Sequence, residues 1–289
     1  MPRRPRARAS LVAAAVAIAC SGSALGAGSS PTAALQVGLS KRGLYAGTID
    51  GVSGPSTAAA VRAFQRRARL PVDGIAGART RGALGRYGRH TLGTRPLRAG
   101  AFGWDVAELQ FLLAWHGFPS GAFDGRFGAH AAAAVRRFQR FAGLAPDGVA
   151  GPATLGALRG PLPRLPISLA WPLPAPVGDR FGPRGRRFHA GVDLLAPAGT
   201  VVGAAAPGRV VWAGYRPGGW GRLVTIAHGD GVRTMYAHLS RVDVRLGEHV
   251  EAGTRVGRVG TTGESTGPHL HFEVRLRGAA VDPLPALRR

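Results

Sequence analysis

The C-terminal fold of this 289-residue chain is decided by one stretch, Gly267-Pro-His-Leu-His-Phe-Glu273. Its polar and apolar residues alternate, which is typical of a β-strand because successive side chains point to opposite faces. His269, His271 and Glu273 therefore share one face, and the leucine and phenylalanine between them share the other. Two histidines on a solvated strand face are common, so this pair alone leaves a structural and a functional role equally open.

A second polar cluster lies some eighty residues earlier, in His189-Ala-Gly-Val-Asp193. Two histidines and one carboxylate, with a fourth position open, form a ligand set that is found at catalytic zinc. An i, i+4 pair on a helix is disfavoured because Gly191 and Val192 are poor helix formers. We therefore expect His189 and Asp193 on a loop that leads into a strand.

The composition predicts a multidomain protein with a large positive charge. The length suffices for two or three domains. After the first thirty residues, no apolar run approaches the roughly 20 residues that a membrane span needs. The net charge of +23 comes from arginine, since Lys41 is the only lysine. This charge favours an anionic polymer as partner, although a biased genome composition accounts for it equally well; the scattered arginines argue against nucleic acid.

Residues 1–30 are predicted to be a signal peptide. A basic start is followed by the apolar run from Leu11 to Ala19 and by the small residues Ala24-Leu-Gly26, where a signal peptidase could cut. This pattern predicts a protein that is secreted or held in the cell envelope. The only cysteine, Cys20, is either a lipid-attachment site or an incidental small residue, and both interpretations stay open.

An internal repeat with an offset of 74 residues occupies the first half of the chain, since Leu35-Gln36 recurs at Leu109-Gln110. The two copies share Asp-Gly turns, an Ala-Val-Arg-x-Phe-Gln run and a later threonine. Each copy predicts three short helices around a small core, over 31–88 and 97–160. The first helix of the second copy is expected from Asp105 to His116, with Asp105 as its N-cap.

The remaining chain changes character at two points. Residues 161–176 are rich in proline, which predicts an extended linker, although Ile167 to Trp171 could pack onto the domain that follows. From 177 to 289, short β-type runs are separated by glycines, which predicts a mainly antiparallel β domain. The expected fold class is a multidomain α plus β chain, with two small three-helix domains before the β domain.

The two repeats resemble the three-helix peptidoglycan-binding module of bacterial wall hydrolases. The resemblance rests on the pattern Asp-Gly, Ala-Val-x-x-Phe-Gln and Asp-Gly-x-x-Gly-x-x-Thr, which runs through both copies. It implies binding to peptidoglycan. Physically, these residues are mostly turn and core positions, so a module that acts only as a spacer would keep the same pattern.

The C-terminal domain resembles the lysostaphin/LytM-type zinc endopeptidases of bacterial cell walls. Several separated motifs carry this resemblance, in order: Arg180-Phe-Gly-Pro-Arg184, His189-Ala-Gly-Val-Asp193, Tyr236-Ala-His-Leu-Ser240 and Thr266-Gly-Pro-His-Leu-His-Phe-Glu273. The resemblance implies that His189, Asp193 and His271 hold one zinc ion. It also implies that His238 and His269 act on the substrate and its attacking water, without deciding which is the general base.

Three further expectations concern the same site. On strict alternation, Tyr236 and His238 share one face of their strand. Glu273 either orients a ligand histidine or forms a surface salt bridge. Some relatives are kept latent by an asparagine that fills the open zinc position; the chain contains no asparagine, so we expect a water ligand and a competent site.

The resulting hypothesis is an exported, monomeric cell-wall hydrolase. Two peptidoglycan-binding repeats would target a zinc endopeptidase to the peptide stems or cross-links of peptidoglycan, and anionic wall polymers are a second expected partner. The rival is a catalytically inactive relative that binds the wall and activates other peptidoglycan hydrolases. Such activators lack zinc ligands, whereas the three expected ligands and both expected catalytic histidines are present here.

Overall fold

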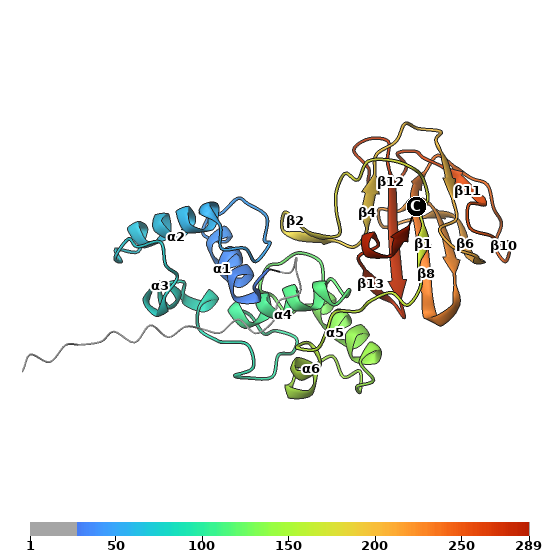
Figure 1. Ribbon diagram of the computed structural model, residues 1–289. Coiled ribbons are helices and arrows are strands. Elements are labelled where there is room, and N and C mark those ends of the chain that lie inside the picture. Colours follow the sequence, from blue (N-terminus) through green and yellow to red (C-terminus); the bar gives the residue numbers. More distant parts are fainter. Residues whose placement is uncertain (1–27, 289) are drawn as a thin grey trace, which may run out of the picture.

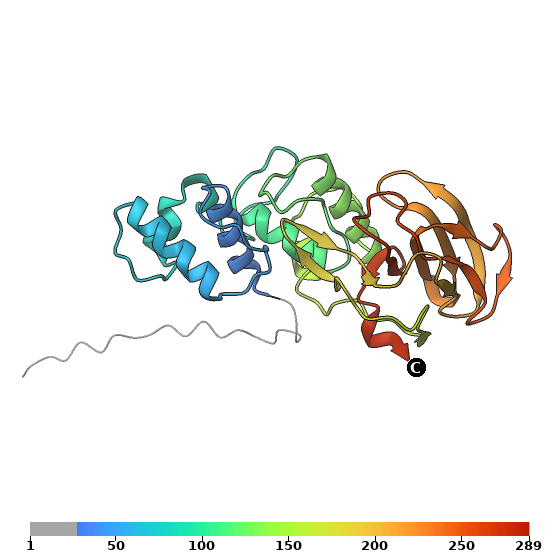
Figure 2. The same cartoon turned by 90° about the horizontal axis from the view of Figure 1, so that it is seen from above.

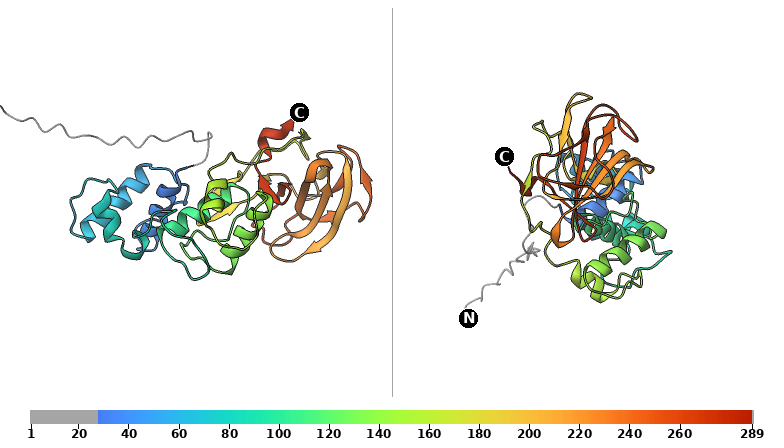
Figure 3. Two further views of the ribbon diagram at one scale, coloured as in Figure 1. Left: turned by 90° about the horizontal axis from the view of Figure 1, so that it is seen from below. Right: turned by 90° about the vertical axis from the view of Figure 1, so that its right-hand side faces the viewer.

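The computed structural model describes residues 28–288, and it has a helical N-terminal region followed by a β-rich C-terminal region (Figure 1). Of the predicted signal peptide, residues 1–30, the first 27 residues, including Cys20, lie outside the described residues, while Ser30 begins helix α1. The two helical repeats and the β domain lie in a row (Figure 3). The predicted fold class, helical repeats before a mainly antiparallel β domain, is confirmed. No helix between residues 28 and 288 is long and apolar enough to cross a membrane.

Each repeat contains two longer helices and one short helix, as the pattern predicted. The bounds are α1 Ser30–Ser40, α2 Pro55–Arg67 and α3 Ala78–Ala83 in the first repeat, and α4 Trp104–Trp115, α5 Ala129–Phe141 and α6 Pro152–Ala157 in the second. The predicted N-cap of α4 is wrong: Gly103 occupies that position and Asp105 lies in the first turn. Asp105 is fully buried and pairs instead with Arg95, at 2.8 Å between Oδ2 and Nε.

The repeats are held together by a hydrogen-bond unit that occurs four times. In each unit a buried glutamine amide donates to the aspartate of an Asp-Gly turn, while its carbonyl accepts the N–H of the glycine. The glycine is in the left-handed region in every case, with φ between +70° and +79°. The chain has four glutamines, and all four are used in this way: Gln36 with Asp50, Gln65 with Asp73, Gln110 with Asp124 and Gln139 with Asp147.

Each 74-residue repeat is therefore built from two half-repeats. A threonine hydroxyl joins three of the four units, as Thr80 does by accepting from Gln65 at 3.1 Å. The corresponding position of the third unit is Ala131, which has no hydroxyl. The Asp-Gly pattern thus serves the fold of the repeat, as its turn and core positions suggested.

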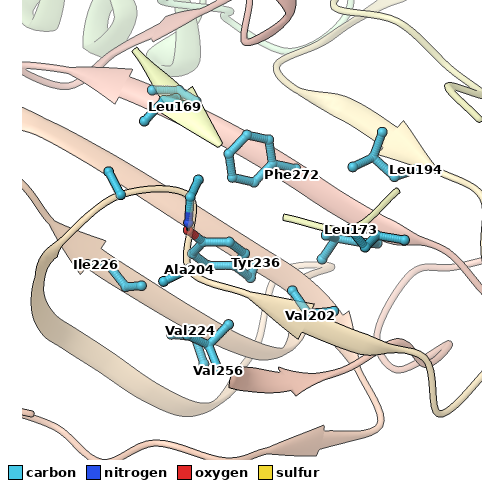
Figure 4. Packing of buried hydrophobic residues seen from close by; sticks show 14 of the residues in the cluster. Leu169, Leu173, Leu194, Val202, Ala204, Val224, Ile226, Tyr236, Val256 and Phe272 are labelled. Atoms are coloured by element: carbon cyan, nitrogen blue, oxygen red, sulfur yellow. Dashed lines mark hydrogen bonds between the residues drawn. The ribbon is translucent and has the colours of Figure 1, made fainter. Parts of the chain in front are cut away.

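The two largest of the four sheets in the β domain enclose an apolar core. The larger sheet has the order β10-β6-β7-β8-β12-β13, with β4 also paired to β12, and the smaller has the order β5-β11-β9. Their bounds are β4 Val192–Leu194, β5 Val201–Gly203, β6 Gly208–Arg216, β7 Gly221–Ala227, β8 Val232–Leu239, β9 Arg241–Val242, β10 His249–Val250, β11 Arg255–Arg258, β12 Leu270–Leu276 and β13 Ala279–Val281. In the core, Tyr236 and Phe272 lie against Leu194 and Val202 (Figure 4).

The proline-rich segment is attached to this core rather than extended through solvent. Strand β1, Leu169–Ala170, pairs in parallel with β14, Leu287–Arg288, at the end of the described chain. Leu169 and Leu173 are buried in the β-domain cluster. Ile167 and Trp171 also pack against this cluster, so the segment from Ile167 to Trp171 packs onto the β domain.

The second repeat contacts the β domain at two places, a projecting β-hairpin and the strand β13. A hairpin of β2, Gly182–Arg184, and β3, Arg187–His189, projects from the β domain toward both repeats (Figures 1 and 2). Separately, the N–H of Ala280 in β13 donates to the carbonyl of Gly117 at 3.0 Å. A Cβ at Gly117 would lie 2.3 Å from the Ala280 oxygen, so this approach requires glycine.

We expect Gln65→Ala to destabilise the protein by about 2 kcal/mol, because it leaves the Asp73 carboxylate, the Thr80 hydroxyl and the Gly74 N–H without their shared partner. Urea unfolding would measure the change. The neighbouring exposed residue provides the control, Arg66→Ala, for which we expect a change within 0.5 kcal/mol in keeping with the roughly ±0.5 kcal/mol typical of surface substitutions. Equal stability of the two variants would contradict the role of the network.

A second stability prediction concerns Glu108 in α4, whose burial raises the pKa of its carboxyl above the ordinary value. Because the folded state then binds the proton more tightly than the unfolded state, stability is greatest below the unfolded pKa and falls as pH rises through the folded pKa. Glu108→Gln should remove this decrease and stabilise the protein at neutral pH. Thermal unfolding between pH 4 and 8 tests it, and an unchanged pH profile would contradict it.

Candidate metal centre

The β-sheet register brings His271 and Asp193 together. His271 in β12 lies opposite Asp193 in β4 on one side and opposite Ala237 in β8 on the other. His189 ends β3 and reaches the same point from the hairpin. The alternation predicted for β12 holds: Leu270 and Phe272 are fully buried in the core, while His271 faces a groove.

Three ligand-type atoms converge at this point. Asp193 Oδ1 lies 2.7 Å from His271 Nδ1 and 3.1 Å from His189 Nε2, and the two imidazole nitrogens are 3.0 Å apart. All three residues are buried. Among residues 28–288, they form a group that could hold a metal ion.

The hydrogen bonds behind the two imidazoles leave the converging nitrogens with free electron pairs. His189 Nδ1–H donates to the carbonyl of Arg180 at 3.0 Å, which leaves Nε2 as a ligand atom. His271 Nε2–H donates to Glu273 at 3.2 Å, which leaves Nδ1. Three electron-rich atoms so close together need a proton or a cation between them, so this donor set fits a divalent metal such as zinc.

The charges of the site show the same requirement in the metal-free protein. Burial lowers the pKa of His271, but hydrogen bonds and charge from Asp193 and Glu273 outweigh it and raise the pKa to about 9. Burial raises the pKa of Asp193, yet the two histidines hold it well below its ordinary value. The electrostatic environment between these side chains therefore favours a positive charge.

Glu273 is part of the buried site and not of the surface. It is 3% exposed and bonds His271 on one side and Arg275 on the other, where Arg275 Nε lies 2.7 Å from Glu273 Oε2. Of the two roles left open by the sequence, the structure therefore favours orientation of a ligand histidine. Its alternation with His271 was the signal that placed it on this face.

The two histidines predicted to act on substrate lie beside the triad. Their ring centroids are 4.8 Å apart, and His269 Nε2 is 3.7 Å from Asp193 Oδ1. His238 Nδ1–H donates to the carbonyl of Thr262 at 2.8 Å, and His269 Nδ1–H donates to that of Gly267 at 2.9 Å. Both rings therefore present Nε2 to the groove. Burial lowers the pKa of His238.

The prediction that Tyr236 and His238 share a strand face is wrong. Tyr236 points into the core, where its hydroxyl accepts the N–H of Ala205 at 2.7 Å, and burial raises its pKa to about 12. His238 has a φ of +60°, a left-handed conformation that interrupts the alternation at the end of β8. This turn of the backbone brings His238 to the groove.

The groove around these residues has a volume of about 610 Å³. The sequence had not singled out two of its members individually. Trp220 lies near His271, with ring centroids 5.8 Å apart, and Arg184 bridges Asp193 and Asp179 at 3.5 and 3.0 Å. Trp220 has no local signal, since an isolated tryptophan is common in any loop, whereas Arg184 could have been found as the last residue of the motif Arg180-Phe-Gly-Pro-Arg184. His228 lies elsewhere, with both ring nitrogens bonded to Pro207 and Thr234.

Comparison with known families agrees with both halves of the fold. Residues 187–283 match the model of Peptidase family M23, and residues 29–84 and 103–158 match the model described as "Putative peptidoglycan binding domain". The chain therefore carries a peptidase M23 domain of the lysostaphin type behind two peptidoglycan-binding repeats. This family implies an extracytoplasmic location in the cell envelope.

Individual relatives resemble the chain over the C-terminal domain. "DD-carboxypeptidase/endopeptidase Mpg" of Neisseria meningitidis is 46% identical over 112 residues, which are 38% of this chain and 26% of that protein. "Lysostaphin" of Staphylococcus simulans is 39% identical over 120 residues, 40% of this chain and 23% of the relative. "Murein hydrolase activator NlpD" of Salmonella dublin is 38% identical over 120 residues, 41% and 31% of the two chains. The chain thus spans about a quarter to a third of the length of these relatives.

We expect purified protein to retain one divalent metal ion per chain, with zinc the predicted ion. His271→Ala should lose most of it, because one of three protein ligands is removed. Elemental analysis by mass spectrometry after dialysis measures the stoichiometry. The exposed His249→Ala serves as control and should stay fully loaded; undiminished metal in His271→Ala would contradict the ligand assignment.

Proposed function

We propose that this chain is an exported cell-wall hydrolase, a zinc-dependent endopeptidase that cleaves peptide bonds in peptidoglycan stems or cross-links. The observation that supports this most is the convergence of His189, Asp193 and His271 beside two further histidines in an open groove. In this proposal residues 31–88 and 97–160 are wall-binding repeats, 161–176 connects them to the catalytic domain, and 177–289 is that domain.

A metal ion held at this site would supply the Lewis acid of the proposed reaction. A zinc ion bound at such a site polarises the scissile carbonyl and makes water a nucleophile at neutral pH. His189 and Asp193 belong to the hairpin end and to β4, while His271 belongs to β12, so three separate segments fix the ligand atoms. Rigid placement of this kind limits the reorganisation that the reaction requires.

The proton transfers are assigned to His238 and His269. Each ring donates its Nδ1–H to a backbone carbonyl, so each has one Nε2 available on the groove side. One of these nitrogens can accept the proton of the attacking water and the other can donate to the developing oxyanion or the leaving amine. The order of these roles is left open, because both rings are held in the same way.

The repeats would raise the local concentration of substrate. Two weak wall-binding modules on one chain increase effective affinity because the second binding event is intramolecular. The excess of arginine would add a salt-dependent attraction to anionic wall polymers. We propose a monomer that is either free in the envelope or lipid-anchored through Cys20, which lies outside the described residues.

The activator function is the competing proposal, and one relative carries that name. An activator of this kind needs only a wall-binding surface and a partner-binding surface. The buried triad and the two oriented histidines have no purpose in such a protein. We therefore favour the enzyme.

Digestion of purified peptidoglycan tests the proposal directly. We expect new peptide termini with the native protein and none after chelation. His269→Ala should lower the rate by about 100-fold or more, in the range typical of a lost general acid or base, while keeping its metal. The masses of the fragments would identify the bond as a direct cross-link or a bridge.

The exposed histidine variant His249→Ala again serves as control and should cleave normally. Undiminished cleavage by His269→Ala would refute its catalytic role. No cleavage by any form would favour the activator.

A further inference from the structure

A second cavity, next to the metal-site groove, reaches the peptidoglycan-binding repeats. It has a volume of about 270 Å³, and Asp179 and Arg184 line both it and the groove. This second cavity is also lined by Trp115 of the second repeat and by Asp50 and Val52 of the first. All three parts of the chain therefore line this second cavity.

The two residues that line both spaces form a surface ion pair. Arg184 Nη1 lies 3.0 Å from Asp179 Oδ2, and both side chains are more than half exposed. Arg184 also reaches the proposed ligand Asp193 at 3.5 Å. A ligand that passes from the metal groove to the repeats would run along these two charged groups.

The repeats are held in place around the cavity by the β2–β3 hairpin. The N–H of Ile49 in the first repeat donates to the carbonyl of Gly185 at 2.8 Å, and the N–H of Phe123 in the second donates to that of Arg186 at 2.7 Å. The Trp115 ring packs edge-on against Phe188, with centroids 5.4 Å apart. Both repeats thus contact the hairpin, whose last residue is His189 (Figure 2).

The lining of the second cavity suits a peptide with charges of both signs. It combines two carboxylates, Asp50 and Asp179, with two guanidiniums, Arg180 and Arg184, and Trp115 supplies an apolar surface. Asp50 uses Oδ1 to hold the turn of its repeat, and among residues 28–288 no hydrogen-bond donor contacts its Oδ2. Peptidoglycan stem peptides carry both free carboxylates and an amino-bearing side chain, so they match this pattern of charge.

We propose that the second cavity, lined by Asp50, Val52, Trp115 and 179–184, is a subsite for the stem peptide beyond the scissile bond. It rests on the proposed function and deepens it, because it makes the repeats part of the substrate site rather than a separate anchor. A cross-linked stem peptide would lie across both spaces, with its scissile bond at the metal and its far end against the first repeat.

The internal half-repeat provides a matched pair of variants. Val52 is 54% exposed and lines the cavity, whereas Ile75, at the equivalent Asp-Gly-x position of the next half-repeat, is 67% exposed and lies outside it. Arginine is tolerated in this turn, since Arg126 occupies the corresponding position in the second repeat. Val52→Arg should therefore fill the cavity without unfolding the protein, and Ile75→Arg is the control.

The experiment compares two soluble substrates, so that binding to insoluble wall has no influence. For a cross-linked stem-peptide dimer, Val52→Arg should lower kcat/KM at least tenfold, mainly through KM, and Ile75→Arg should match the native protein. For a short peptide that spans only the scissile bond, all three proteins should be equal. Equal rates of the two variants on the dimer, or an equal loss on both substrates, would overturn the subsite.

A binding measurement separates this inference from the proposed activity. In a His269→Ala background, calorimetry with the dimer should give at least tenfold weaker binding for Val52→Arg than for Ile75→Arg, whether or not any form cleaves. Absence of cleavage by the native protein would refute the endopeptidase alone, while equal dissociation constants of the two variants would refute the subsite. The same titration is repeated with a dimer that still carries its glycan sugars. If the two variants differ only with that ligand, the site binds glycan and the peptide assignment is wrong.

Discussion

The pairing register of β12 is the constraint on which the site depends. Because side chains alternate across a strand, a slip of one residue would turn His271 into the core and Phe272 into the groove. The register is fixed on both sides, by β4, which brings Asp193 opposite His271, and by β8, which runs to His238. The fully buried Leu270 and Phe272 make any slip unfavourable, since it would expose both to water. The apolar residues of the motif are thus as necessary to the metal site as the histidines.

The imidazole rings of the site are oriented by bonds on their far sides. Three of the four rings donate Nδ1–H to a backbone carbonyl, and they present Nε2: His189, His238 and His269. His271 is reversed, because the buried Glu273 accepts its Nε2–H and leaves Nδ1 toward Asp193. Backbone carbonyls cannot change their charge, so the first three rings are held in one tautomer without a further ionisable group, and only His271 depends on a carboxylate.

The sequence predicted the fold class and the convergence of five site residues, because separated motifs at fixed order and spacing carry that information. It failed where the backbone departs from a regular period. His238 reaches the groove only through a left-handed φ, and Asp105 pairs with Arg95 instead of capping α4. The half-repeat was visible in the four glutamines and their Asp-Gly turns, yet the 74-residue period concealed it. The contacts of Trp115 and Ile49 with the hairpin have no local pattern, since they depend on how whole domains dock.

The approach of Gly117 to Ala280 distinguishes two repeats that otherwise follow one pattern. The matching glycine of the first repeat, Gly43, has open space where a Cβ would be, whereas a Cβ at Gly117 would collide with the backbone of β13. Both glycines have a left-handed φ that favours glycine, but only in the second copy would a side chain also collide with another domain. Once a duplicated module has docked in this way, the two copies lose their interchangeability, and exchange of their order would separate the hairpin from its support. Although the two repeats look like independent modules in the sequence, the second repeat and the β domain therefore constrain each other's sequence at their contact.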